Sequence, residues 1–402
     1  MNQNLSVRAG IFCLGAIVAA LAAVTFAEYV PDDVASLLGG DAVDKILTIL
    51  ASSMLAVVTF SLSTLIASYS VAASGAPARA TAMIMSDRGA QTALSAFLGA
   101  FIFSIVSLVA LSTGYYGSKG RVILFGITII VLTGVVWTVI RWIGQLSGLG
   151  QLANLIKGVE RSTVRVIQAQ KKHFAEIEED TPVAEGELIF CEHTGFLQTL
   201  DLTKLTELLD GLDADIWIEV YPGQFMYPGL PMAKISKSIQ VNADLVSEIR
   251  ACFYVGRSRT FEDDPRFGFV VLSEIGSRAL SPGINDPGTA VEIISSQLRL
   301  LTEFHRVCDS QEAERLPRNI HLKLITAEDV LDDAFQAIAR DGAAMVEVGI
   351  ALQKALGSLS EYPNFAAPAR AMAKRNIEFS LLLMKSKFDR ERLLRAASWR
   401  NN

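Results

Sequence analysis

Four long apolar runs in the first 145 residues constrain the fold of this chain more than any other feature. They lie at about 11–30, 46–71, 93–112 and 122–140, and each contains about 19 residues or more. A run of this length crosses the hydrocarbon core of a bilayer as a helix. We therefore predict four transmembrane helices within a membrane domain at 1–145.

The rest of the chain carries most of the charge, although only 19% of all residues are charged and 51% are hydrophobic. This composition is too apolar for an ordinary soluble protein and too charged for one embedded throughout. It predicts a membrane α-helical domain followed by a cytosolic α+β region. Because the net charge is −6 and no basic stripe stands out, we expect the lipid bilayer as partner and no nucleic acid.

The loops between the apolar runs predict the orientation of the chain. Arg8 precedes the first run, Arg79 and Arg88 lie between the second and third, and Arg141 follows the fourth. Positively charged loops stay in the cytoplasm, which predicts that both termini lie there. The first run is long for the apolar part of a signal peptide, so we interpret it as a retained helix.

The second apolar run carries hydroxyl side chains at Ser52, Thr59, Ser63 and Ser70. At about 100° per residue they stay within a stripe roughly 60° wide on one face of a helix. One interpretation is a homo-oligomer in which this hydroxyl stripe lines a pore or water-filled path. The other interpretation is that the hydroxyl stripe packs closely against a neighbouring helix. Small residues allow such packing, and the third run has a similar seam of small residues.

Charged side chains and His are absent from the deeper parts of all four runs. Proton relays and voltage sensors depend on such residues at membrane depth. The sequence therefore argues against both functions, whereas a weakly selective pore remains compatible with it.

The region after the last run divides into three parts. Apolar residues at helical spacing and then an acidic stretch predict an amphipathic connecting helix and linker at 146–182. Apolar β-branched runs separated by Pro-Gly turns predict a small β module at 183–238, which resembles barrel-sandwich modules. A helical module is expected at 239–402, with helices near 243–253, 265–280, 287–306, 327–357 and 366–396.

Two helices of the last module are expected to start in the same way. In Asp264-Pro265 and Asp286-Pro287, proline takes the first helical position, where no backbone donor is needed. The preceding Asp can then cap the free N–H groups of the first turn. Between the two helices, Gly283 can supply the left-handed conformation of a tight reversal.

Polar residues around this reversal form a candidate network or ligand site. They would either make a buried ion-pair network or bind a small anionic ligand or ion near two helix N-termini. The set comprises Arg257, Arg259, Asp264, Glu274, Arg278, Ser281, Asn285, Asp286 and Thr289. Because no His and no activated Ser or Cys pairing accompanies them, we expect no catalytic residues.

The cysteines and histidines give no sign of a metal site. Cys13, Cys191, Cys252 and Cys308 are widely spaced without a CxxC pair, which is typical of a reduced, cytosolic region. The four His are likewise separated in sequence. We therefore expect no metal and no cofactor, and we do not expect an enzyme.

The stretch GRSRTFEDDPRFGFVVLSEIGSRALSPGINDPGTAV at 256–291 resembles the signature of the predicted bacterial membrane proteins grouped as domain-of-unknown-function family 2254. Further matches such as Gly195, Gly223 and Asp333 extend the resemblance over nearly the whole chain. Glu274 departs from the pattern, which usually has Asp there. The resemblance implies several membrane helices followed by a cytosolic region and no particular activity.

The resemblance to bacterial proteins also implies a location in a bacterial inner (plasma) membrane, and two functions follow as hypotheses for an integral protein of that membrane. We favour an oligomeric, channel-like conduit whose second span lines the path and whose cytosolic region regulates it. The alternative is a membrane-anchored sensor or scaffold that binds a ligand or protein through its cytosolic domain. Substituting Arg259 and Asn285 separates them, because a sensor would lose binding with its fold intact.

Overall fold

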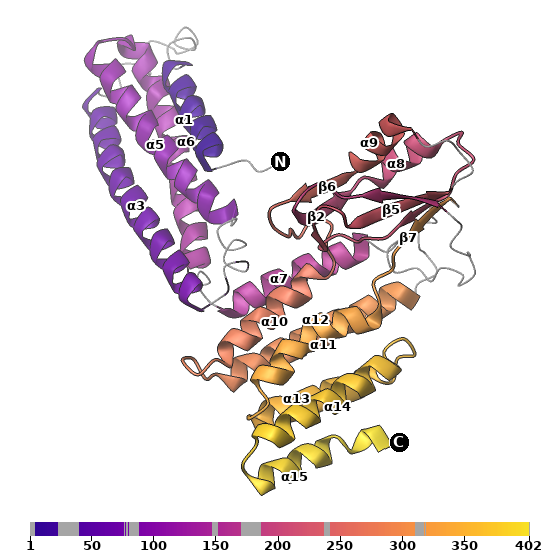
Figure 1. Ribbon diagram of the computed structural model, residues 1–402. Coiled ribbons are helices and arrows are strands. Elements are labelled where there is room, and N and C mark those ends of the chain that lie inside the picture. Colours follow the sequence, from indigo (N-terminus) through magenta and orange to yellow (C-terminus); the bar gives the residue numbers. More distant parts are fainter. Residues whose placement is uncertain are drawn as a thin grey trace. The chain divides into compact units, whose positions relative to one another are not determined.

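The protein is described by a computed structural model that covers residues 5–22, 40–75, 77, 79, 88–146, 152–169, 186–236, 242–309, 317 and 319–401 (Figure 1). The chain forms two compact units. The first, the membrane unit, comprises Met1–Ser74 and Thr81–Asn154, and the second comprises Gly75–Ala80 and Leu155–Asn402.

The membrane unit consists of four described helices, α1 (Leu5–Ala22), α3 (Gly40–Gly75), α5 (Arg88–Ser112) and α6 (Gly117–Leu146). Three of them are long and apolar enough to cross a membrane, over Ala42–Ser68, Gly89–Ser112 and Lys119–Gly144. The first predicted span, 11–30, corresponds only in part to α1, whose apolar stretch Val7–Leu21 is shorter. The end of that predicted span lies outside the described residues.

Small residues let α1 lie close against α5. A Cβ atom at Gly99 of α5 would be 3.2 Å from the Cβ of Phe12 on α1, so only glycine allows this approach without a shift. Near the C-terminal end of α1, the hydroxyl of Tyr116 donates a hydrogen bond to the carbonyl of Ala20 at 2.8 Å. The two contacts fix the middle and the C-terminal end of α1.

Helix α7 (Leu152–Ala169) is amphipathic, as its apolar spacing predicts, and its apolar face is buried within the second unit. A Cβ atom at Gly268 would lie 1.7 Å from Oγ1 of Thr163, so the backbone of the following helical region packs directly on α7. Arg299 forms a bidentate ion pair with Glu160 at 2.7 and 2.8 Å. The apolar face of α7 is therefore part of the core of this unit.

Among the described residues, seven short strands and two helices form the β module of the second unit. The elements are β1 (Gly186–Phe190), β2 (Gly195–Leu200), α8 (Leu202–Leu209), β3 (Ile216–Ile218), β4 (Phe225–Met226), β5 (Pro231–Ser236), α9 (Ala243–Arg250), β6 (Phe253–Gly256) and β7 (Ile320–Leu322). They make a four-stranded sheet in the order β1-β5-β3-β7 and a three-stranded sheet in the order β4-β2-β6. The pairs are antiparallel except β3 with β7.

Strands β6 and β7 lie in segments that the helical periodicity did not predict as strands. Each has only three or four residues, too few for a period of two to stand out from the flanking helices. Strand β7 returns to the sheet from beyond residue 300 and pairs with β3 from Ile216 to Ile218. The buried faces of both sheets share one core cluster, which includes Leu197, Ile216, Ile235 and Ile320.

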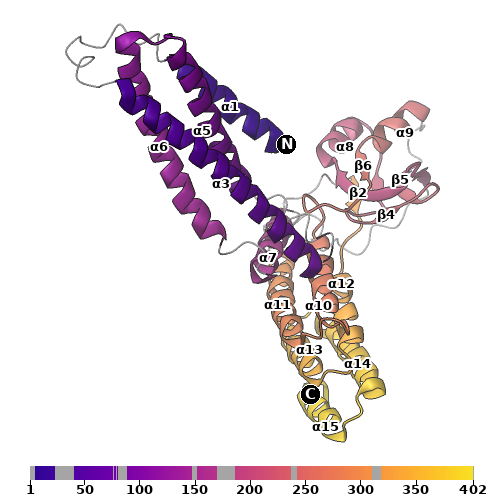
Figure 2. The ribbon, with the colours of Figure 1, turned by 90° about the vertical axis from the view of Figure 1, so that its left-hand side faces the viewer.

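The remaining helices stack side by side, with α15 at the far end (Figures 1 and 2). They are α10 (Phe267–Ala279), α11 (Pro287–Asp309), α12 (Ala327–Asp341), α13 (Val346–Leu359), α14 (Ala366–Leu383) and α15 (Lys387–Ala396), followed by a 3-10 turn at Ser398–Asn401. Helix α10 packs on α11 and α12, and α13 packs on α11, α14 and α15.

The predictions of single helices at 327–357 and 366–396 were wrong, because each contains a break. Helix α12 ends at Gly342, where a Cβ atom would meet Val348 Cγ1 at 2.6 Å. Helix α14 ends before Met384, and Ser386 then caps α15 by accepting a hydrogen bond from the backbone N–H of Asp389 at 3.2 Å. Both breaks fold the chain back on itself, which adds α13 and α15 to the stack.

Candidate functional site

The hydroxyl stripe of α3 faces away from the other helices of the membrane unit. Ser52, Thr59, Ser63 and Ser70 are all exposed. The inner face of α3 lies about half a helical turn away around the axis and is buried, at Val43, Leu47, Leu50, Met54 and Leu65. The small-residue seam of α5 differs, because Ala100 and Ser104 are buried. No described element of the chain covers the stripe.

Two hydroxyls of the stripe bond to carbonyls of their own helix. Ser52 donates to the carbonyl of Thr48 at 3.0 Å, and Thr59 donates to that of Leu55 at 2.9 Å. Such bonds satisfy a hydroxyl in an apolar environment without any partner helix. Their oxygens still have lone pairs with which to accept hydrogen bonds from water. The stripe is thus chemically suited both to a path and to lipid contact.

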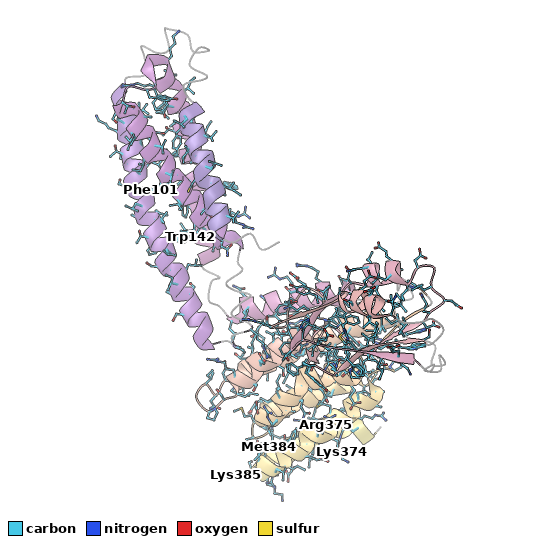
Figure 3. The ribbon with its side chains drawn as sticks, turned by 45° about the horizontal axis from the view of Figure 1, so that its top comes forward. Phe101, Trp142, Lys374, Arg375, Met384 and Lys385 are labelled. Atoms are coloured by element: carbon cyan, nitrogen blue, oxygen red, sulfur yellow. The ribbon has the colours of Figure 1, made fainter. Side chains whose placement is uncertain are left out.

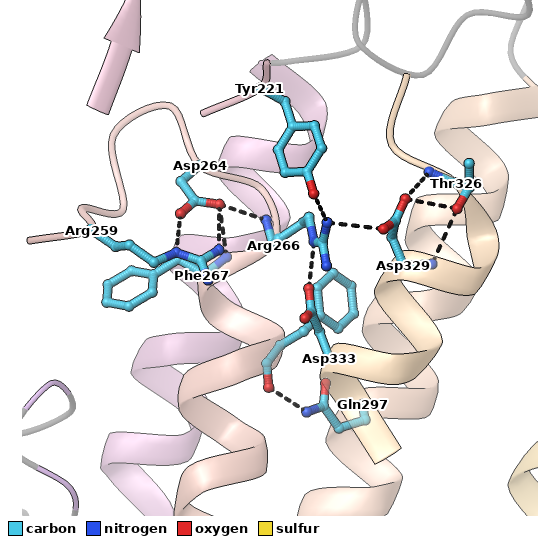
Figure 4. Close-up of polar contacts among 10 residues, drawn as sticks. Tyr221, Arg259, Asp264, Arg266, Phe267, Gln297, Thr326, Asp329 and Asp333 are labelled. Atoms are coloured by element: carbon cyan, nitrogen blue, oxygen red, sulfur yellow. Dashed lines mark hydrogen bonds and ion pairs between the residues drawn. The ribbon is translucent and has the colours of Figure 1, made fainter. Parts of the chain in front are cut away.

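In the second unit, the most deeply buried charged group of the candidate set is Asp264, with 1% of its surface exposed. It accepts two hydrogen bonds from the guanidinium of Arg259, at 2.6 and 2.9 Å (Figure 4). One of its oxygens also accepts from the backbone N–H groups of Arg266 and Phe267, at 3.1 Å each. Burial raises the pKa of Asp264, and the guanidinium of Arg259 opposes that change.

Asp264 therefore accepts hydrogen bonds from N–H groups at the start of α10, but the predicted helix start was wrong: the N-cap residue is Arg266 and the helix begins at Phe267, not at Pro265. The helix begins later than predicted because Pro265 belongs to a turn. This turn brings the Asp264 carboxylate within hydrogen-bond distance of the N–H groups of Arg266 and Phe267. A cap of this kind satisfies donors that have no partner within the helix.

Arg266 is the centre of a second polar cluster that the pattern of the sequence did not identify (Figure 4). Its Nε donates to Asp333 at 2.5 Å, and its Nη1 donates to Asp329 at 3.1 Å and to the hydroxyl of Tyr221 at 2.5 Å. Burial alone lowers the pKa of Arg266, but the hydrogen bond and charge of Asp333 raise it above its ordinary value. The guanidinium therefore stays charged.

The partners of Arg266 come from separate parts of the second unit. Asp329 and Asp333 lie four residues apart on α12, and Tyr221 follows β3. Asp329 also forms a capping box with Thr326 at the start of α12. The spacing of Asp329 and Asp333 on one helical face was the only sign of this cluster in the sequence. It did not indicate that Arg266 is the cation to which they are bonded.

The two clusters together join the β module to the helical stack. Gly223, in the turn after Tyr221, has a φ of 93°, and a Cβ atom there would be 2.2 Å from Oδ2 of Asp264. The guanidiniums of Arg259 and Arg266 are bonded to carboxylates of the chain itself. We refer to Tyr221, Gly223, Arg259, Asp264, Arg266, Asp329 and Asp333 as the joint.

Other members of the predicted set lie apart from the joint. Arg278, Ser281, Asn285, Asp286 and Thr289 are at or beyond the C-terminal end of α10, a helix of 13 residues and so about 20 Å long. Arg257 is exposed on the segment after β6. Only Arg259 and Asp264 of the nine predicted residues belong to the joint.

The reversal between α10 and α11 is a compact turn built mainly from backbone hydrogen bonds. Asn285 has a φ of 52°, and it is the non-glycine residue with positive φ among the described residues. The prediction that Gly283 takes this conformation was wrong, because the chain needs it two residues later, directly before the cap. The N–H of Asp286 donates to the carbonyl of Ala279 at 2.8 Å, which closes the turn.

Asp286 then caps α11, which begins at Pro287 as predicted. Its carboxylate accepts from the backbone N–H of Thr289 at 3.0 Å and from the Thr289 hydroxyl at 2.6 Å. These two hydrogen bonds lower the pKa of Asp286. The local conformation and the cap thus account for Asn285, Asp286 and Thr289.

A cleft of about 630 Å³ lies beside the end of α10 in the second unit. Glu274 pairs there with Arg79, and the hydroxyl of Ser277 donates to Asp341. The cleft is lined by Pro77, Glu274, Ser277, Arg278, Leu280, Ser281, Pro282 and Asp341. It brings together Glu274, Arg278 and Ser281 of the predicted set.

Within the described residues, no group of three or more His, Cys, Asp or Glu side chains could hold a metal ion. Cys191 and Cys252 are buried, and burial raises the pKa of the Cys252 thiol to about 11. A thiol with that pKa is almost entirely protonated at neutral pH and is a poor nucleophile.

Comparison with known proteins gives two kinds of match. An uncharacterized protein of Mycobacterium bovis and one of Mycobacterium tuberculosis are each 26% identical to the chain over 118 residues. The match covers 28% of this chain and 23% of each relative, so the chain spans about a quarter of the relatives' length. No solved structure matches the chain.

Residues 2–358 match the family described as predicted membrane protein DUF2254. The matched region includes the described helices of the membrane unit, the β module and the joint. The chain therefore belongs to the DUF2254 family of predicted membrane proteins.

Proposed function

We propose that this membrane protein assembles as a homo-oligomer in which the hydroxyl stripe of α3 lines a path across the bilayer. The observation that carries the proposal is the outward direction of the stripe. From Ser52 to Ser70 the stripe extends about 27 Å along α3, at 1.5 Å per residue. This is close to the roughly 30 Å thickness of the hydrocarbon core. A path across the bilayer requires polar groups over such a length.

The residues beside the stripe support an assembly of several copies. Leu55 and Leu62 flank it on one side with exposed fractions of 53% and 44%, and Ile49 and Phe60 flank it on the other with 64% and 62%. In a ring of subunits, two such apolar ridges can contact the neighbouring copies while the hydroxyls face the common axis. In this arrangement the hydroxyl stripe is in contact with water, and the apolar ridges are in contact with the neighbouring subunits.

We also propose that α1 lies in the membrane as a fourth helix, with both termini in the cytoplasm of a bacterial inner membrane. Its close contacts with α5 through Phe12 and Gly99 and its bond to Tyr116 support this arrangement. Arg8 lies near the start of α1 and Arg141 near the end of α6. Because positively charged residues beside membrane spans stay in the cytoplasm, these two helix ends are assigned to the cytoplasmic side.

A sensor or scaffold is the second candidate, and the cleft at the end of α10 is the observation that favours it. The cleft contains both acidic and basic side chains, including Glu274, Arg278 and Asp341. Such a lining could bind a small ion or polar ligand. The joint gives this candidate less support, because Arg259 and Arg266 are bonded to the chain's own carboxylates.

Flux through proteoliposomes tests the leading proposal. The wild type should release a trapped small ion faster than empty liposomes. Thr59→Leu and Ser63→Leu should each reduce release severalfold, because they narrow the path and remove a hydroxyl. Val136→Leu on α6 is the matched control, since Val136 is 51% exposed outside the stripe and should leave release unchanged.

Absence of release by the wild type, with a monodisperse and folded sample, would reject the conduit. Equal loss in Thr59→Leu and Val136→Leu would instead point to a general effect on the membrane unit. The sensor candidate predicts no release in any of these samples and binding that depends on Arg278.

A further inference from the structure

A pocket with several polar side chains in its lining lies at the end of the membrane unit where α5 begins and α6 ends. It has a volume of about 360 Å³. Its lining consists of Gly89, Thr92, Ala93, Trp137, Thr138, Arg141 and Trp142. The remaining pockets described in this unit are lined mostly by aliphatic residues and glycine, so the combination of cation, hydroxyl and indole groups is distinctive.

The positive charge of the pocket comes from Arg141 and from Arg8 next to it. Arg141 is an exposed residue of α6 that contributes to the lining. Arg8 of α1 donates from Nη1 to the hydroxyl of Thr92 at 3.3 Å, and Thr92 also lines the pocket. Asp44, the acidic side chain that the structure describes in the helices of this unit, lies near the start of α3 at the opposite end. The described surroundings are therefore positive.

Two tryptophans line the pocket, a residue type that is typical of the level of lipid headgroups. Trp142 of α6, labelled in Figure 3, is 6% exposed. Its ring packs edge-on against that of Phe97, with ring centroids 6.0 Å apart. Trp137, five residues earlier on α6, is 69% exposed. Tryptophan is enriched at membrane interfaces because its ring is apolar and its N–H is polar. Arg141 follows at the edge of the candidate span Lys119–Gly144.

We propose that this pocket binds a phosphate group presented by the headgroup of an anionic phospholipid. Arginine recognises phosphate through charge-assisted hydrogen bonds, and basic pockets between membrane helices suit acidic headgroups. Arg141 supplies the charge, Thr92 of α5 and Thr138 of α6 also line the pocket, and the exposed ring of Trp137 is available to contact the bound lipid. This site is independent of the hydroxyl stripe on α3 and does not require a conduit.

Lipid retention by the purified full-length protein tests the proposal. Native mass spectrometry would compare phosphatidylglycerol with phosphatidylcholine of the same acyl chains, and thermal unfolding would be followed with either lipid or inorganic phosphate added. Arg141→Gln should lower phosphatidylglycerol retention about tenfold, as expected for loss of charge-assisted hydrogen bonds. Arg141→Lys keeps the positive charge but loses the paired N–H donors of the planar guanidinium. Its phosphatidylglycerol retention should lie between those of the wild type and Arg141→Gln.

Arg121→Gln is the matched control, because Arg121 lies near the start of α6, at the opposite end of the helix. It removes the same charge and should leave retention unchanged. Equal loss in Arg121→Gln, unchanged retention in folded Arg141→Gln, or equal retention of the two lipids would overturn the proposal. Protection by inorganic phosphate that depends on Arg141 and matches that of phosphatidylglycerol would assign the pocket to a soluble ion and reject the lipid.

Discussion

The carboxylate of Asp264 lies so close to Gly223 that a Cβ atom on the glycine would be 2.2 Å from Oδ2. The two residues are 41 positions apart and connect the turn after β3 to the start of α10. Asp264 is also bonded to Arg259 and to two backbone N–H groups. A shift of its side chain would therefore break these hydrogen bonds. This contact makes Gly223 a sensitive test of the joint.

Gly223→Ala should destabilise the second unit by about 3 kcal/mol, since it combines a strained positive φ with a steric clash. Gly229→Ala is the control, because Gly229 has nearly the same φ, 89° against 93°, and nothing within 4 Å of the added Cβ. It should cost only about 1–2 kcal/mol. Thermal unfolding of both variants measures the difference, and equal losses would contradict the packing described for Asp264.

Arg266→Met should destabilise the protein by about 3–5 kcal/mol, because it leaves Asp333 partly buried without its cation. Asp333 is 17% exposed and its bond to Arg266 is 2.5 Å long. Arg340→Gln should cost less than about 1 kcal/mol, since Arg340 is 64% exposed and pairs with its sequence neighbour. Adding Asp333→Leu to Arg266→Met should recover part of the loss. A double variant no more stable than the single one would argue against the pairing.

Asn285→Ala should cost about 1 kcal/mol, whereas Asn285→Gly should be nearly neutral, because only the positive φ of the turn is at issue. Circular dichroism during thermal unfolding would rank the two variants. If instead both variants kept full stability and lost the binding of a ligand, the side chain of Asn285 would have a recognition role that the turn does not explain.

The cap at Asp286 predicts a dependence of stability on pH. Its pKa is lowered in the folded state by the hydrogen bonds from Thr289, so its contribution is present above the unfolded pKa of about 3.9 and is lost as pH falls through the folded pKa. Asp286→Ala should therefore cost about 1 kcal/mol at pH 7 and less at pH 3. Asp286→Asn, which keeps the acceptor without the charge, serves as control. A difference from wild type that stayed constant over this range would contradict the cap.

The sequence predicted those parts of the structure that depend on local properties of the chain. Apolar length and composition sufficed for α3, α5 and α6, because a membrane span is recognised by its hydropathy alone. The start of α11 at Pro287 followed from the chemistry of proline and its preceding cap. The amphipathic face of α7 followed from its helical spacing.

The parts that the sequence did not predict depend on contacts between distant residues. The bond of Arg266 to Asp333 joins residues 67 positions apart, and no local pattern indicates which cation meets which acid. The three residues of β7 form a strand because they pair with the edge of β3, although helices precede and follow them in the sequence. The break at Gly342 reflects the packing of Val348 against it. Each of these depends on the tertiary fold.

The central claim, that the hydroxyl stripe of α3 borders water, is tested most directly by cysteine accessibility in the membrane. In a variant without the four native cysteines, Thr59→Cys and Ser63→Cys would be exposed to a charged thiol reagent in reconstituted vesicles. Ile130→Cys on α6 is the control, since Ile130 is 72% exposed and lies within the span Lys119–Gly144. We predict rapid labelling at both stripe positions and little at Ile130. Labelling at Thr59 and Ser63 as slow as at Ile130 would contradict a water-filled path along α3.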